Sequence, residues 1–133
     1  MFGQDILQHL FEQYLIPAGT DAEDFASIAS GFKSDFINSI KKSAADDVVV
    51  GFKSVVCYRT GLNISTSCTD HELVEAIAAV HRQHRVNPKA IRISDKALND
   101  YVVRATLEIA GQFKKPGKFI ALHLMLFLPY YIA

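Results

Sequence analysis

The predicted fold class rests on the stretch Val48-Val49-Val50-Gly51-Phe52-Lys53-Ser54-Val55-Val56-Cys57-Tyr58. Its first part is rich in β-branched residues and has no polar alternation, which is typical of a strand covered on both faces, as parallel strands are in α/β proteins. Such a strand needs neighbours along both edges, because unpaired main-chain groups are costly in a dry interior. We therefore predict part of a larger α/β fold.

Amphipathic helices are predicted on both sides of this strand, from apolar residues at helical spacing. They cover residues 4–15, 20–45, 69–85 and 94–111. Thr20 with Glu23 and Thr69 with Glu72 match the capping-box pattern, and Ser94 is the expected N-cap of the last helix. Gly31 lies inside the second helix, where a bend is expected. The order is helix, helix, strand, helix, helix, and then an apolar segment that could form a second strand.

Composition limits the classes of function. The chain has 133 residues, half of them apolar, and its 14 basic and 14 acidic residues cancel. Because no basic block stands out, we expect no nucleic-acid partner and no membrane-surface partner. Two cysteines without CxxC spacing and no leader pattern favour a cytoplasmic protein. The apolar tail 119–133 is shorter than the roughly 18 residues of a membrane helix and contains Pro129.

Two stretches carry a resemblance to a known family. Val50-Gly51-Phe52-Lys53-Ser54-Val55-Val56-Cys57-Tyr58-Arg59-Thr60-Gly61-Leu62 resembles a signature of amidohydrolase-related proteins, which include the FluG-like N-terminal domains of fungal regulators. Lys96-Ala97-Leu98-Asn99-Asp100-Tyr101-Val102-Val103-Arg104 is similar to the helix that leads into the family's next barrel strand. In order and spacing, the resemblance covers about residues 25–116.

The resemblance implies a fragment of a (β/α)8 TIM barrel, mostly helical, with one clear parallel strand and a second candidate strand. It also implies a divalent metal, zinc above all, that activates water to hydrolyse a C–N bond of a small-molecule substrate. In full-length FluG-like relatives, this domain is joined to a glutamine-synthetase-like domain, which is one expected partner. Self-association is another.

The family's metal ligands are missing from this sequence. No His-x-His pair is present, and His123 follows Pro116 in the wrong phase, because the family would place its ligand at Ile120. We therefore predict a partial amidohydrolase-related domain over residues 1–118, truncated and inactive, with no metal bound. Residues 119–133 are then an aberrant apolar tail. An unspliced intron donor encoding Gly117 to Phe119 is one hypothesis for its origin, which the coding DNA tests.

Lys53, Tyr58 and Arg59 are the candidate substrate-binding residues. A lysine at the end of a barrel strand could meet a substrate or metal-site carboxylate, and Arg59 could bind a carboxylate with both arms of its guanidinium. A lysine in a salt bridge and a solvated arginine in a turn are the alternatives. His81 and His84 share a helix face but are expected at a solvated helix end. His9 and His71 are expected at the surface, and Cys57 as a buried structural thiol.

Three hypotheses follow for the function and fold together. The leading one is an amidohydrolase-related hydrolase of C–N bonds, truncated in this chain. The second is a non-catalytic binding or regulatory module that associates through exposed strand edges. The third is a helical domain with one incidental strand. Substrate identity, metal count and oligomeric state are not predicted by the sequence.

Overall fold

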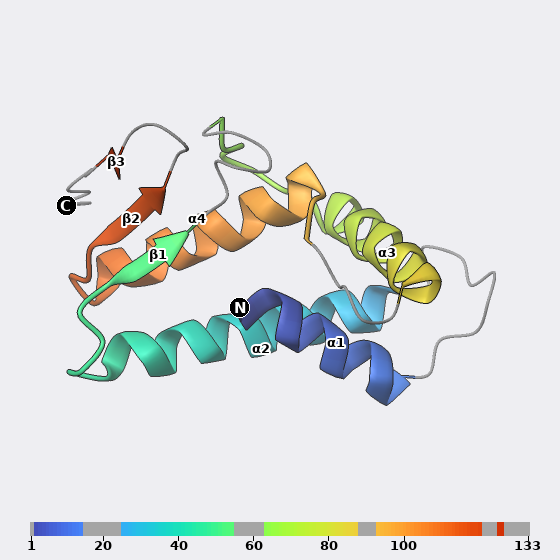
Figure 1. The fold of residues 1–133 in the computed structure, drawn as a ribbon, viewed down its shortest axis with the longest axis horizontal. Coiled ribbons are helices and arrows are strands. Elements are labelled where there is room, and N and C mark those ends of the chain that lie inside the picture. The colour runs from blue at the N-terminus through green and yellow to red at the C-terminus, as the bar shows by residue number, and fades with distance from the viewer. Residues whose placement is uncertain (1, 15–24, 55–62, 88–92, 121–124, 127–133) are drawn as a thin grey trace.

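The computed structural model describes residues 2–14, 25–54, 63–87, 93–120 and 125–126 (Figure 1). These residues form four helices and three short strands. In chain order they are α1 (Phe2–Tyr14), α2 (Ala26–Ala45), β1 (Phe52–Ser54), α3 (Asp70–Val86), α4 (Lys96–Gln112), β2 (Gly117–Ile120) and β3 (Met125–Leu126). No helix in these ranges is long and apolar enough to cross a membrane.

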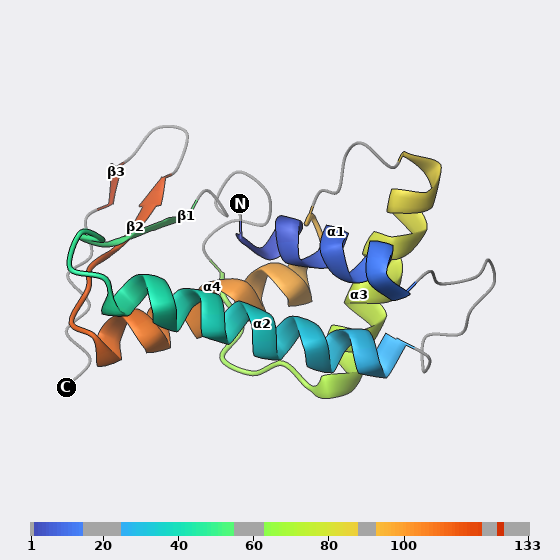
Figure 2. The ribbon, with the colours of Figure 1, turned by 90° about the horizontal axis from the view of Figure 1, so that it is seen from below.

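The core lies between the helices, and α2 runs through its middle. Figures 1 and 2 show α1 and α4 alongside α2, and α3 at the end of the molecule opposite the strands. One face of α2 is buried along its whole length, at intervals of three or four residues. Its buried side chains are Ile28, Ala29, Phe32, Phe36, Ile40 and Ala44. This periodicity is that of an amphipathic helix that packs on several neighbours, and it confirms the helix predicted to end near Ala45.

The helix boundaries follow from capping groups. Thr69 accepts a hydrogen bond from the N–H of Glu72 at 3.1 Å, and Glu72 accepts one from the N–H of Thr69 at 2.7 Å. The capping box predicted for α3 is therefore confirmed. The N-cap of α4 is Asp95, whose carboxylate accepts from the N–H of Leu98 at 3.2 Å, so the prediction of Ser94 was wrong by one residue. Thr20 and Glu23 lie outside the described residues.

The strands form a small sheet of order β1-β2-β3. β1 and β2 are parallel, with Phe52 opposite Gly117 and Ser54 opposite Phe119. β2 and β3 are antiparallel, with Ile120 opposite Met125. The sheet lies beside α4 at the end of the molecule where α2 finishes (Figure 1).

The prediction of a TIM-barrel fragment was wrong. In a barrel, long parallel strands make the core and the helices cover them. Here the helices supply nearly all of the main core cluster, and among the strands only Phe52 is described as packing against it, partly buried. The longest described strand has four residues. The chain is a small helical domain, so the third hypothesis agrees with the structure better than the first.

Within the stretch from Val48 to Tyr58, residues 48–51 do not belong to the buried strand that the apolar pattern suggested. β1 covers only Phe52–Ser54, while Val48 is 85% exposed and Val50 is 82% exposed. Asp46 explains the difference: its carboxylate accepts from the N–H of Val48 at 2.9 Å, and its main-chain oxygen accepts from the N–H of Val49 at 3.1 Å. These bonds close a turn after α2 and keep the first valines out of the sheet. Residues 55–58 lie outside the described ranges.

The predicted boundary between residues 118 and 119 falls inside β2. The idea that the tail is aberrant stays a prediction, which the coding DNA would test. His123 lies outside the described residues.

Two glycines should respond in opposite directions to replacement by alanine. A Cβ on Gly51 would lie 2.8 Å from the main-chain oxygen of Pro116, which also accepts from the N–H of Phe52. We expect Gly51→Ala to lower the free energy of unfolding by about 1–3 kcal/mol, because main chain must move. A Cβ on Gly31 would meet only the Leu10 side chain, at 3.4 Å, and α2 runs unbroken through this position despite the expected bend.

Gly31→Ala is the matched control. It should leave stability unchanged or raise it by up to about 1 kcal/mol, because alanine favours a helix more than glycine does. Urea unfolding followed by circular dichroism measures both variants. Equal loss of stability in the two would contradict the close contact at Gly51.

Candidate functional site

The three predicted substrate-binding residues are only partly placed by the structure. Lys53 lies in the middle of β1 with its side chain exposed, and no ion pair of Lys53 is found among the described residues. Tyr58 and Arg59 lie outside the described ranges. The grouping of these three residues therefore stays a prediction.

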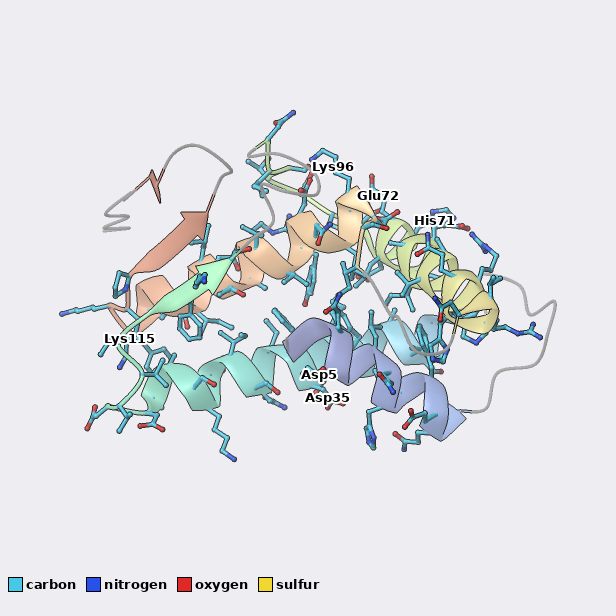
Figure 3. The ribbon with its side chains drawn as sticks, in the orientation of Figure 1. Asp5, Asp35, His71, Glu72, Lys96 and Lys115 are labelled. Carbon is cyan, nitrogen blue, oxygen red and sulfur yellow. The ribbon has the colours of Figure 1, made fainter. Side chains whose placement is uncertain are left out.

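A buried carboxylate fixes the chain just after residues 55–62. Asp100, on the second turn of α4, accepts through Oδ2 from the N–H of Ser65 at 3.0 Å and from the ammonium group of Lys96. The same ammonium group donates to the main-chain oxygen of Asn63. Figure 3 shows Lys96 at the start of α4. The Lys96–Asp100 pair is thus a clamp that holds the segment 63–65 against α4.

The Asp100 carboxylate of the clamp is buried in the protein interior. Asp100 is 1% exposed, whereas the side chain of Lys96 remains half exposed. Three buried polar atoms on this part of α4 have no hydrogen-bond partner among the residues that the structure describes: Asn99 Nδ2, Asp100 Oδ1 and Arg104 Nη1. Each unpaired buried group costs stability. What the clamp does structurally is hold the residues from Asn63 to Ser65 against α4.

The clamp and β1 together anchor both ends of the segment 55–62. Ser54 ends β1, which pairs with β2, and Asn63 begins the segment held by Lys96. Loops held by rigid elements are where binding residues are commonly found. The described contacts fix the residues that flank this segment on both sides. In the clamp, Asp100 Oδ2 is engaged by Ser65 and Lys96, and Oδ1 is buried, so the carboxylate is not exposed to solvent.

A second polar group on α4 begins at Arg104, one turn after Asp100. The guanidinium of Arg104 sits 6.0 Å from the centre of the Tyr101 ring. Burial raises the pKa of the Tyr101 hydroxyl and the pKa of the half-buried Cys68 thiol. A thiol with a raised pKa is a poor nucleophile at neutral pH. The structure therefore favours a structural role for Cys68.

An ion pair joins α2 to the start of α3. Lys33 donates to Asp70 at 2.6 Å, and this hydrogen bond raises the pKa of Lys33. Both side chains are largely solvated, so the pair contributes little to stability. At the same end of α3, hydrogen bonds from Thr69 lower the pKa of Glu72, which is the expected effect of a capping box on its carboxylate.

The histidines differ from expectation at one important position. His9 and His71 are exposed, as predicted, but His81 is buried at 6% exposure and does not lie at a solvated helix end. Its ring packs between two phenylalanines, which the helix pattern alone did not indicate. Cys57 and His123 lie outside the described residues. Within the described ranges, no group of three or more His, Cys, Asp or Glu side chains could hold a metal ion.

The Lys96–Asp100 clamp was not predicted from the sequence. Two signals were available: a Lys and an Asp at i, i+4, and the apolar pair Val103 and Leu107 on a second face of the same helix. Val103 is buried and packs with Ile64 and Leu107 in a separate small cluster. An acidic residue next to a second apolar face of a helix is expected to have a buried carboxylate. The spacing does not identify the hydrogen-bond partner of that carboxylate.

Comparison with known proteins finds one informative similarity. Over 108 residues the chain is 38% identical to protein fluG of Emericella nidulans. The chain is similar to part of that protein. The match takes in 78% of this chain and 12% of fluG, so the chain spans a small fraction of the relative's length. No protein-family model and no solved structure matches the chain. The wider amidohydrolase-related resemblance therefore stays an expectation.

Removing the charge of Asp100 should destabilise the fold. We expect Asp100→Asn to lower the free energy of unfolding by roughly 1–3 kcal/mol, because it removes a charged acceptor from Lys96 and Ser65 in a dry site. Asp35→Asn is the matched control: Asp35 is an exposed acid on α2 (Figure 3) and should change stability by less than about 0.5 kcal/mol. Urea unfolding measures both variants, and equal effects would argue against the clamp.

Proposed function

We propose that this chain is a non-catalytic binding module that associates with a second copy of itself along the outer edge of β1. The observation that carries the proposal is the exposure of Val48 and Val50 beside an edge strand. β1 stands at one end of the strand order β1-β2-β3, so one of its edges faces away from the sheet. Exposed apolar residues next to an open strand edge favour pairing with another polypeptide.

The main-chain groups of β1 support pairing at this edge. Phe52 donates its N–H to the oxygen of Pro116 at 2.9 Å, so its main chain faces β2. Because successive residues in a parallel strand direct these groups to alternate edges, the N–H and C=O of Lys53 face away from β2. Within the described part of the chain, the Lys53 main chain has no hydrogen-bond partner on that side. A second strand could supply one.

The charges around β1 favour a second copy as the partner. Asp47 and Lys53 lie on either side of the exposed valines, both exposed, and neither has an ion pair among the described residues. In an antiparallel arrangement about a two-fold axis near Val50, Lys53 of each copy is directed toward Asp47 of the other. A parallel arrangement would instead bring like charges together. The segment is therefore complementary to itself in one orientation.

Lysines at the two valines should weaken the association. We expect the chain to form a dimer whose Kd rises at least about tenfold in Val48→Lys/Val50→Lys, because the exposed apolar area is replaced by charge. Val86→Lys is the matched control, since Val86 is 87% exposed at the end of α3 and should leave the Kd unchanged. Sedimentation equilibrium at several concentrations measures all three proteins.

Two outcomes would contradict this proposal. A chain that stays monomeric at all concentrations would exclude the second copy as the partner. If that monomer instead bound a glutamine-synthetase-like domain, the alternative partner expected for full-length relatives, the edge would still be a binding surface. An equal effect of Val86→Lys would show that association does not use β1.

The hydrolase hypothesis is a second candidate, supported by the resemblance of residues 50–62 to the amidohydrolase-related signature. We propose that a longer relative hydrolyses a C–N bond of a small molecule with a divalent metal. In that protein, Lys53, Tyr58 and Arg59 would contact the substrate. For this chain by itself we propose little or no turnover and no resident metal.

Metal analysis tests the second candidate. After purification with zinc present and extensive dialysis, we expect well below one zinc ion per chain. The reason is that His123 as a single ligand cannot hold the ion tightly. Plasma mass spectrometry measures the content. One tightly bound zinc per chain, lost in His123→Ala but not in His9→Ala, would contradict the proposed inactivity.

A further inference from the structure

His81 is the contact through which α3 meets α1 and the start of α2. Its ring centre lies 5.0 Å from that of Phe11 on α1, at an interplanar angle of 73°, and 5.1 Å from that of Phe25, which precedes α2. Phe11 is 4% exposed and Phe25 is 2% exposed, so the imidazole sits in a predominantly aromatic, dry environment. His84, one turn along α3, also contacts Phe11, with ring centres 5.6 Å apart.

A proton on His81 would create a buried cation without a counter-charge among the described residues. Burial is the first cause that lowers the pKa of His81, and the positive charges of Arg85, His84 and Arg82 on its own helix lower the pKa further. The phenylalanine rings replace water and offer no hydrogen bond to an imidazolium. Charging a group in such a place is costly unless a partner is near.

Among the described residues, the acidic groups on α1, α2 and α3 are exposed to solvent. On α1, Asp5 and Glu12 are exposed, and Glu12 accepts from Gln8 at 3.0 Å. His9, also on α1, is exposed. On α2, Lys33 is paired with Asp70. On α3 itself, Glu75 faces His71 at 3.9 Å.

Three acids precede Phe25, namely Asp21, Glu23 and Asp24, and they lie outside the described residues. Every variant in the hydrogen-exchange experiment retains these three acids, so differences between variants do not arise from them.

We propose that His81 is a pH sensor that makes the docking of α1 on α2 and α3 reversible, so that α1 detaches when the surroundings become acidic. Detachment would let water reach the imidazole. It would also expose the apolar side of α1, made by Leu7, Leu10 and Phe11, together with the surface that these residues cover. The result is an apolar surface that is available at acidic pH and hidden at neutral pH. This inference does not depend on association through β1.

The sign of the pH effect follows from linkage. The pKa of His81 is lower in the folded protein than in the unfolded chain, where it is near the ordinary histidine value of about 6.5. Protons therefore bind better when α1 is detached. Stability of the docked form is constant above that ordinary value, falls as the pH drops through it, and becomes constant again below the folded pKa.

Hydrogen exchange of the full chain tests the sensor. We expect the protection of the α1 amides, corrected for intrinsic exchange, to fall severalfold between pH 7.5 and pH 5, while that of α4 changes less. His81→Phe keeps an aromatic ring but cannot take a proton, so its α1 protection should not depend on pH in this range. His9→Gln, at an exposed position on α1, and His84→Gln, on the same side of α3, should keep the response.

Each other outcome would overturn the proposal. The same response in His81→Phe as in the parent chain would exclude His81 as the sensor, and loss of the response in His84→Gln alone would assign it to His84. Equal loss of protection in α1 and α4 would indicate global acid unfolding. If the phenylalanine variant does not fold at pH 7.5, His81→Gln serves in its place, since it is uncharged at every pH.

Discussion

The fold depends on the packing of the other three helices against one face of α2. Phe32 and Phe36, one turn apart on that face, are almost completely buried and stack with their ring centres 5.7 Å apart. Tyr101 of α4 contacts both rings, with centres 6.2 and 6.4 Å away. Two aromatic residues of one helix thus fix the position of α4. Because α4 in turn carries Asp100 and leads into β2, the segment 63–65 and the sheet are both placed relative to this aromatic contact.

The helices could be predicted from the sequence because their information is local. Apolar residues at spacings of three and four identify the buried side of α2, and the pair Thr69 and Glu72 marks the start of α3. The start of α4 was missed by one residue because Ser94 and Asp95 are both good N-caps, and only the geometry shows that Asp95 accepts from Leu98. An error of this size is inherent in a pattern that two adjacent residues satisfy.

The strand and the candidate site depend on distant parts of the chain, and for this reason they were not predicted correctly from the sequence. An apolar β-branched run indicates a buried strand only if another element covers it. Nothing among the described residues covers Val48 or Val50, because the turn at Asp46 directs them outward. The prediction for His81 was wrong for the opposite reason. Its charged neighbours on α3 indicated a solvent-exposed position, but Phe11 and Phe25, which come from other segments, cover its ring. Burial of a single residue is a property of the neighbours, which local patterns do not contain.

The exposed valines are held in place by the far end of α4. Lys114 adopts a left-handed conformation with φ 54° just after this helix, a position that more often holds glycine. The resulting change of direction lets Lys115 (Figure 3) donate from its ammonium group to the main-chain oxygens of Asp46 and Val49. The segment before β1 is therefore tied to the segment before β2 by a side chain as well as by the strand ladder. A surface fixed at both ends loses less conformational entropy on binding than a free segment would. For this physical reason, residues 46–54 can be treated as a preorganised surface.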